Sequence, residues 1–220
     1  MTLIALDLDG TLEDSRADMV TAVERVRRAL GLPARPAAEL RPWVNAGMDA
    51  LYRACFDDFL AAGDAERRYA QVREAYEADY LAHVAVETRL YPGIAAALGE
   101  LAGLGRLACV TNKPERISRR LLEALGVAGR FSSVVGGDSC AQAKPSPLML
   151  EAAARGAGFA GAPAKRFMIG DTAADIRMGK AYGATTIWCA WGYADAPGEA
   201  PDFEANAPEM LPRIVRDRRG

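Results

Sequence analysis

Two aspartates, Asp7 and Asp9, directly follow a short apolar run near the start of the chain. The run at residues 3–6 is typical of a buried strand, and a strand's period of two turns both carboxylates toward the same side. Two like charges held that close repel each other, and a bound divalent cation is the usual compensation. The pair therefore indicates a metal-assisted nucleophile beside an acid/base group. The plainer alternative is an acidic turn, since Asp and Gly both favour turns.

The two carboxylates can be given separate chemical roles. Asp7 is the candidate nucleophile, because a carboxylate that attacks phosphorus forms an acyl phosphate and splits one difficult step into two easier ones. Asp9 is the candidate acid/base, which would protonate the leaving oxygen and then activate water for the second step.

A second polar point, Thr111 and Asn112, follows the apolar run at residues 107–110. A hydroxyl and adjacent backbone N–H groups at a strand end can hold phosphate oxygens. Ordinary turn capping by both residues is the alternative. The neighbouring Lys113 is expected to be a solvated side chain.

Lys144 directly precedes a proline in the segment Ala-Lys-Pro-Ser-Pro-Leu. The rigid proline would hold the lysine at the entry of a helix, where its charge could neutralise the nucleophile and a transferring phosphoryl group. An exposed lysine is the commoner fate of this residue type and is the alternative.

Two further aspartates, Asp171 and Asp175, lie in the segment Gly-Asp-Thr-Ala-Ala-Asp, between a predicted strand and a predicted helix. Asp171 precedes the helix and is well placed as a metal ligand, and carboxylate oxygens with water and phosphate suit Mg²⁺. Thr172 and Asp175 also match a capping box at the helix start. Metal binding and helix capping both remain open for Asp175.

The elements that must position these residues alternate between strand and helix. Apolar runs predict strands at residues 3–6, 107–110, 133–135, 167–169 and 185–188. Helical patterns between the later runs indicate a parallel sheet with right-handed crossovers, a Rossmann-like α/β fold. Ligands collect beyond the carboxyl ends of such strands, which would gather the four polar points in one place. Residues 194–212 are expected to form a surface connection to a short final helix.

Residues 15–85 show only helical patterns. Ser15 can cap the first helix, and an apolar stripe follows at Met19, Val23, Val26 and Leu30. Because the first strand belongs to the α/β pattern, this small all-helical segment is an insertion. The predicted domains are therefore an α/β core at 1–14 and 86–220 and a helical domain at 15–85.

Composition excludes several classes of protein. The 220 residues carry 27 basic and 29 acidic groups, so no basic excess points to nucleic acid. The four cysteines form no zinc or disulfide pattern, which favours reduced thiols in a cytoplasmic protein. No apolar run approaches the roughly 20 residues of a membrane span. The single histidine, His83, excludes a multi-histidine metal site and is expected to be structural.

With these motifs in order, the chain resembles the haloacid dehalogenase superfamily of phosphatases. The family's four motifs match residues 7–11, Thr111, Lys144 and residues 170–175, and the helical insertion resembles the family's small helical cap. Residues 12–15 and 110–114 are similar to the phosphoglycolate phosphatase-like branch. Gly47 and Met48 resemble the cap loop that faces the active site in that branch.

The resemblance implies a Mg²⁺-dependent phosphomonoester hydrolase acting on a small phosphorylated metabolite, as a monomer or homodimer. It implies that Asp7 is the nucleophile, Asp9 the acid/base and Lys144 the bridge between phosphate and nucleophile. The implied metal ligands are Asp7, the backbone carbonyl of Asp9, Asp171, and Asp175 directly or through water. The implied phosphate-binding residues are Thr111, Asn112 and Gly10.

One residue departs from the family pattern. Glu13 stands where apolar residues are frequent in relatives, and its charge on a turn predicted to be flexible would alter closure of the cap or contact with the outer end of the substrate. The cap residues considered for leaving-group specificity are Trp43, Asn45 and Arg53.

Two other functions use the same residue types. A sugar phosphomutase of this superfamily would return the phosphoryl group to a sugar instead of to water. A receiver-like phospho-signalling module also uses Asp, Thr and Lys with Mg²⁺, although the Asp-x-Asp pair and the helical insertion argue against it. A dehalogenase is disfavoured, because its hydrolysis needs no acid/base at position 9.

Overall fold

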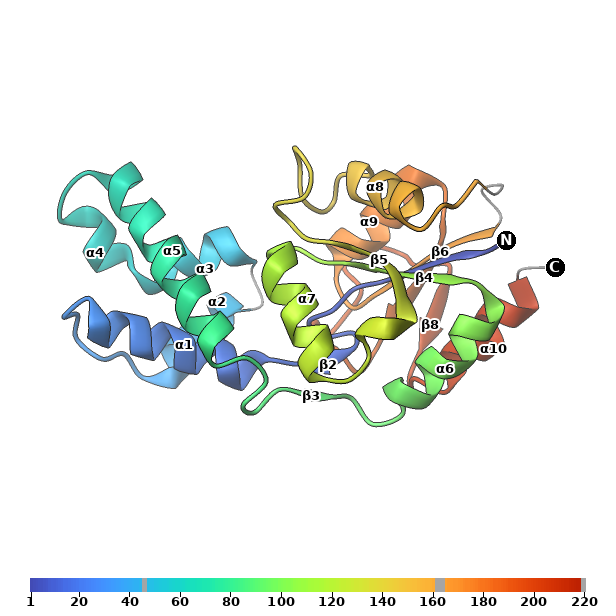
Figure 1. The fold of residues 1–220 in the computed structure, drawn as a ribbon, viewed down its shortest axis with the longest axis horizontal. Coiled ribbons are helices and arrows are strands. Elements are labelled where there is room, and N and C mark those ends of the chain that lie inside the picture. The colour runs from blue at the N-terminus through green and yellow to red at the C-terminus, as the bar shows by residue number, and fades with distance from the viewer. Residues whose placement is uncertain (45–46, 161–164, 219–220) are drawn as a thin grey trace. The chain divides into compact units, whose positions relative to one another are not determined.

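The computed structural model describes residues 1–44, 47–160 and 165–218 (Figure 1). The chain forms two compact units. The sheet unit comprises residues 1–14 and 89–220, and the helical unit comprises residues 15–88. That the first unit carries the chemistry and the second acts as a cap stays a prediction.

The sheet unit is built on six parallel strands. They are β1 (Leu3–Leu6), β4 (Arg106–Val110), β5 (Phe131–Val135), β6 (Arg166–Gly170), β7 (Thr185–Cys189) and β8 (Phe203–Ala205). Their order in the sheet is β5-β4-β1-β6-β7-β8, and every neighbouring pair is parallel. The predicted α/β fold with a parallel sheet and a helical insertion is confirmed.

The register of the central strands decides where the site forms. Leu6, at the end of β1, is aligned with Cys109 on one side and with Ile169 on the other. The chain therefore leaves all three strands at one edge of the sheet. Residues directly after these strands are brought together although they come from distant parts of the sequence.

One strand lies where a surface connection was expected. β8 (Phe203–Ala205) pairs with β7 inside the stretch 194–212. It is three residues long, too short to show a periodic pattern. Its position is supported by Asp202, whose carboxylate accepts hydrogen bonds from the N–H and hydroxyl of Thr186, both at 2.8 Å. A second, two-stranded antiparallel sheet joins β2 (Glu13–Asp14) to β3 (Arg89–Leu90).

Helices cover both faces of the large sheet (Figure 1). Side chains alternate along each strand, so Leu3 and Ala5 of β1 face the helices α8 (Leu148–Gly156) and α9 (Ala173–Tyr182), where they join one buried apolar cluster. Helices α6 and α10 pack against each other on the opposite face. The helical elements of the unit are α6 (Ile94–Leu104), α7 (Glu115–Ala124), a 3₁₀ turn η1 (Ala128–Arg130), α8 (Leu148–Gly156), α9 (Ala173–Tyr182) and α10 (Met210–Arg218).

The described part of the helical unit contains five helices and no strand. They are α1 (Arg16–Ala29), α2 (Ala37–Val44), α3 (Met48–Cys55), α4 (Asp57–Ala61) and α5 (Ala65–Ala82). The predicted stripe on α1 is buried at Met19, Val23 and Val26. Ser15 occupies the N-cap position of α1, but its hydroxyl lies 3.5 Å from the Met19 sulfur and does not cap a helix N–H, contrary to expectation.

Two buried charges organise the helical unit. Arg27 of α1 is fully buried and donates hydrogen bonds to the carbonyls of Pro33 and Cys55, at 2.8 and 2.6 Å, and to Asp58 at 2.7 Å. Asp18 accepts from the backbone N–H of Thr88 at 2.9 Å, and also from its hydroxyl at 2.7 Å. Asp18 thus ties the beginning of the unit to its end.

None of the helices in the described part of the chain combines the length and apolar character that a membrane span requires.

Candidate active site

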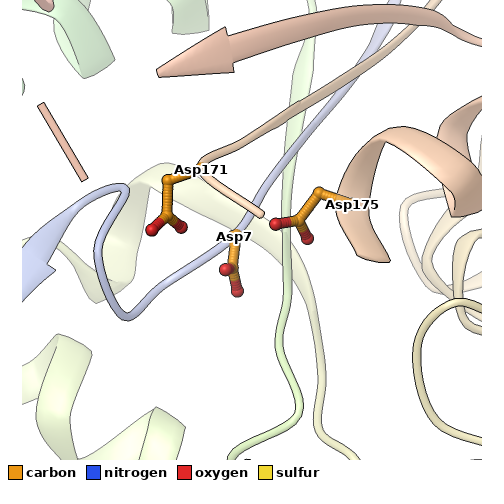
Figure 2. A group of neighbouring side chains, drawn as sticks. All are labelled: Asp7, Asp171 and Asp175. Carbon is orange, nitrogen blue, oxygen red and sulfur yellow. The ribbon is translucent and has the colours of Figure 1, made fainter. Parts of the chain in front are cut away.

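Three carboxylates meet at the edge of the sheet where β1 and β6 end. One oxygen from each of Asp7, Asp171 and Asp175 lies within 4.8 Å of the other two, and all three residues are buried (Figure 2). Asp7 extends the strand pairing, because its N–H donates to the Ile169 carbonyl at 2.9 Å. Asp171 follows β6, and Asp175 lies in the first turn of α9. The structure thus brings together three predicted site residues from two distant segments.

Lys144 is inserted among these carboxylates. Its ammonium lies 2.5 Å from Asp7 Oδ1 and 2.6 Å from Asp175 Oδ1, and its side chain is only 3% exposed. The backbone N–H of Lys144 donates to the side-chain oxygen of Asn112 at 3.0 Å. Lys144 is therefore a fixed internal charge and not the exposed lysine of the alternative interpretation.

The electrostatics of the cluster are unbalanced. Burial and then the charge of Asp175 raise the pKa of Asp7 well above its usual range. The same two causes raise the pKa of Asp171 to about 6. Burial alone would lower the pKa of Lys144, but the charges of Asp175 and Asp7 outweigh it and raise that pKa. One ammonium faces three carboxylates, and this all-oxygen donor set fits a hard divalent cation.

Asp175 serves the helix and the cluster together. Its Oδ2 accepts from the N–H and the hydroxyl of Thr172, at 3.1 and 2.7 Å, which completes the capping box of α9. Its Oδ1 faces Lys144. The capping alternative is therefore present in the structure, and direct metal ligation by Asp175 stays a prediction.

Asp171 is enclosed by neighbours that sequence reasoning missed or assigned differently. Its Oδ1 accepts from the Thr11 hydroxyl at 3.1 Å, and its Oδ2 accepts from the N–H of Tyr193 at 2.7 Å. A Cβ at Gly192 would lie 2.2 Å from the Asp171 Cβ. In the sequence, the only sign of these contacts is the segment Trp-Gly-Tyr, which follows the last predicted strand.

Gly10 has a steric role at the same carboxylate. It adopts a φ of +80°, and a Cβ there would lie 2.3 Å from Asp171 Oδ2. Its N–H donates to the Glu13 carbonyl at 2.9 Å, inside the turn. Gly10 is required for close approach, and its phosphate-binding role stays a prediction.

The second predicted phosphate point lies at the end of β4. Thr111 is buried, its N–H donates to the Val135 carbonyl at 3.0 Å, and its hydroxyl accepts from the N–H of Lys113 at 3.1 Å. The side-chain oxygen of Asn112 is used by Lys144. Asn112 therefore positions Lys144, and phosphate contacts by Thr111 and Asn112 stay predictions.

Asp9 has a different partner from Asp7. Its carboxylate forms an ion pair with Lys113, and its side chain is 19% exposed. The Lys113 side chain is only 2% exposed, so the expectation of a solvated Lys113 is wrong. The ion pair gives Lys113 an internal partner that its position in the sequence did not indicate. A backbone carbonyl ligand at Asp9 stays a prediction.

Glu13 is fully buried within β2 and is not on an exposed flexible turn. Burial, then the charge of Asp9, raises the pKa of Glu13 well above its usual range. The residue that departs from the family pattern is therefore a direct neighbour of the predicted acid/base.

The cap candidates lie in the helical unit. Arg53 is exposed, pairs with Asp49 at 3.0 Å, and its guanidinium lies 4.8 Å from the centre of the Tyr69 ring. Trp43 is exposed as well. Asn45 lies outside the described residues. A specificity role for these three stays a prediction.

The family model for haloacid dehalogenase-like hydrolases matches residues 1–183. The chain belongs to the haloacid dehalogenase-like hydrolase family. The predicted resemblance and the prediction of an enzyme of this family are confirmed.

Similar proteins agree on the branch. The chain is 33% identical over 216 residues to a phosphoglycolate phosphatase of Aquifex aeolicus, covering 98% of this chain and 97% of the relative. It is 38% identical to a phosphoglycolate phosphatase of Neisseria meningitidis, covering 94% and 88%. A crystal structure of a predicted phosphoglycolate phosphatase from Haemophilus somnus superposes with a TM-score of 0.84 at 26% identity and 98% coverage of both chains.

Proposed function

We propose that this protein is a Mg²⁺-dependent phosphomonoester hydrolase that acts on a small, phosphoglycolate-like metabolite through an aspartyl-phosphate on Asp7. The observation that carries the proposal is the buried cluster of Asp7, Asp171 and Asp175 around Lys144, at the carboxyl ends of the central strands. Relatives of similar length that are named phosphoglycolate phosphatase support the substrate class.

The first step uses Asp7 and Asp9. A carboxylate oxygen of Asp7 attacks the phosphorus, the bond from phosphorus to the leaving oxygen breaks, and Asp9 gives that oxygen a proton. Lys144 orients Asp7 and balances charge on the phosphoryl group. The Thr111 hydroxyl donates to a non-bridging oxygen.

The second step regenerates the enzyme. Asp9 takes a proton from water as the water oxygen attacks the phosphorus, and the bond from phosphorus to Asp7 breaks. Phosphate leaves and Asp7 is again a carboxylate. Acid/base assistance of this kind contributes about 10² to 10⁴ in rate.

Asp7, Asp171, Asp175 and the carbonyl of Asp9 are the residues that would hold Mg²⁺. A bound cation would supply the positive charge that the three carboxylates lack and would neutralise the transferring group. The raised pKa values of Asp7 and Asp171 support this assignment, because they reflect burial and then repulsion from Asp175, and a bound cation would offset both.

The helical unit is proposed as the cap that selects the leaving group, with Trp43, Asn45 and Arg53 as candidates. The proposed setting is the cytoplasm, with a small phosphorylated metabolite as the partner and a monomer or homodimer as the assembly.

The deciding experiment is a phosphoester panel with Mg²⁺ and with a chelator. It would contain phosphoglycolate, sugar phosphates, nucleotides and pyrophosphate, with phosphate release measured for wild type and for D7N. We expect Mg²⁺-dependent release that is greatest on phosphoglycolate-like substrates and lost in D7N. Folded wild-type protein that releases no phosphate would contradict the proposal, and isomerised sugar phosphate without free phosphate would indicate the phosphomutase.

A further inference from the structure

The sheet unit buries a second lysine that the steps above do not use. Lys113 follows the candidate phosphate residues Thr111 and Asn112, and its ammonium pairs with Asp9. Lys144 contacts Asp7 and Asp175. The two carboxylates of the Asp-x-Asp pair therefore have separate lysine partners.

The backbone around Lys113 is held at several points. Its N–H donates to the Thr111 hydroxyl at 3.1 Å, and its carbonyl accepts from the N–H of Gly137 at 3.1 Å. Helix α7 begins two residues later, with Pro114 at the N-cap. A long side chain that starts from a fixed backbone and ends in a buried ion pair loses most of its freedom, so its ammonium marks a defined position.

Glu13 adds a second group beside Asp9. The backbone bridge between Asp9 and Glu13, and the bond from the Gly10 N–H to the Glu13 carbonyl at 2.9 Å, close a tight turn that sets this neighbour in place. The pairing of Glu13 with Leu90 in the small sheet fixes the same backbone from outside the turn. The Glu13 side chain is completely buried.

We propose that Lys113 is a positioning residue for the acid/base: its ion pair holds the partly exposed Asp9 carboxylate in one orientation, on a turn that the Glu13 backbone closes. The inference rests on the proposed function, because it assigns Asp9 the proton transfer. Lys113 then acts through Asp9 and does not touch the phosphoryl group.

This role has a kinetic signature. Misplacing a proton donor slows substrates whose leaving oxygen needs the proton and spares those whose leaving group departs as a stable anion. A lysine that only supports the fold, or only binds phosphate, would affect both kinds of substrate alike. The dependence of rate on the leaving group therefore separates the two roles.

The test compares K113M with the control K180M, which removes an exposed lysine on α9 that pairs with Glu199. kcat and KM are measured with Mg²⁺ on phosphoglycolate and on p-nitrophenyl phosphate. We expect kcat/KM of K113M to fall by about 10-fold or more on phosphoglycolate and by less than about 3-fold on p-nitrophenyl phosphate. This ratio covers only the steps up to the aspartyl-phosphate and leaves out the later water attack that both substrates share. K180M should match wild type on both.

If K113M loses activity equally on the two substrates, or loses none, the inference is overturned. Wild-type activity in the same assay would still support the proposed function. Wild type that hydrolyses neither substrate overturns the proposed function itself. If K113M does not fold, K113R decides the matter, because it keeps the charge with altered reach and should show the same selective loss. Unchanged leaving-group dependence in K113R overturns the inference.

Discussion

Each unit of the molecule buries a strongly paired cation, and Arg27 and Lys144 are balanced differently. In the helical unit, the Arg27 guanidinium donates to one carboxylate, Asp58, and to backbone carbonyls, so its hydrogen-bonding groups are satisfied within the unit. In the sheet unit, the Lys144 ammonium lies between Asp7 and Asp175, with Asp171 close by. The first arrangement is neutral as folded, whereas the second keeps an excess of negative charge.

The difference separates a structural charge from a functional one. A buried pair whose partners are complete gives the fold a defined geometry and asks for no further ligand. A buried cluster with raised carboxyl pKa values is destabilised by itself and becomes favourable only when something positive arrives. The carboxylate cluster thus lowers the stability of the sheet unit at the place where the proposed chemistry occurs.

The largest expected effect comes from removing one charge of the cluster. D7N should lower turnover by at least about 10³-fold, because the proposed nucleophile is lost. In the presence of a chelator the same variant should unfold at a higher temperature than wild type, since one buried like charge is gone. Thermal unfolding and phosphate release measured on the same preparation check both parts. A less stable D7N would refute the claim that the cluster is under electrostatic strain.

Removing the balanced cation should have the opposite effect on stability. R27M leaves the carbonyls of Pro33 and Cys55 without this donor, and Asp58, which is 35% exposed, keeps only Arg35 at 3.3 Å. Leaving buried acceptors unsatisfied should lower the free energy of unfolding by about 1–3 kcal/mol. Denaturant unfolding in Mg²⁺ and in chelator should give the same loss, because no metal can replace Arg27. R25M is the matched control, since the Arg25 side chain pairs with Asp79 but is 27% exposed, whereas that of Arg27 is 1% exposed. If Mg²⁺ restored the stability lost in R27M, the proposed difference between the charges around Arg27 and around Lys144 would not hold.

The supports of Asp171 should matter for the metal more than for the fold. T11V removes the hydroxyl that donates to Asp171 Oδ1 and keeps the shape of the side chain. Loss of a partner behind a metal ligand typically costs 10- to 100-fold in affinity, so Mg²⁺ binding by calorimetry should weaken by about 10-fold or more. T11S, which keeps the hydroxyl, should bind Mg²⁺ as wild type does. Equal binding by T11V and T11S would exclude this support.

The smallest expected effects are two pH dependences of opposite sign. A hydrogen bond from Arg27 lowers the pKa of Asp58 to about 2, so the stability it contributes is present above the ordinary carboxyl pKa of about 4 and is lost as pH falls toward 2. Burial raises the pKa of Asp171 to about 6, so in metal-free protein its contribution is present below about pH 4 and is lost as pH rises through 6. The free energy of unfolding, measured across pH, should lack the first dependence in D58N and the second in D171N. If both aspartates changed the stability in the same direction with pH, the proposed difference between the two units would be contradicted.

Much of this site could be predicted because its residues directly follow apolar runs. A buried strand such as Leu3–Leu6 has a readable pattern, and the carboxyl ends of parallel strands share one edge, so Asp7, Thr111 and Asp171 could be grouped from the sequence alone. The aspartates after these runs therefore pointed to a common place.

The residues that escaped prediction depend on contacts between distant segments. Lys113 has the sequence context of a surface loop, and its burial and its ion pair with Asp9 are visible only in the folded chain. Glu13 is polar by type, so only the tertiary structure shows its burial. Arg27 lies among other basic residues on α1, and its partners come from three later positions. β8 was missed because three residues carry no period.

The place of β1 in the sheet has a consequence for how the chain acquires its shape. β1 lies between β4 and β6, so Leu3 is paired with Arg106 and with Arg166. During synthesis, β1 cannot pair on both sides until β6 has been made. Residues 15–88 can already fold before that point, through contacts among themselves. Closing such long loops is slow compared with local helix formation. We therefore expect the helical unit to form first on the ribosome and the two proposed catalytic aspartates, Asp7 and Asp9, to reach their lysine partners last.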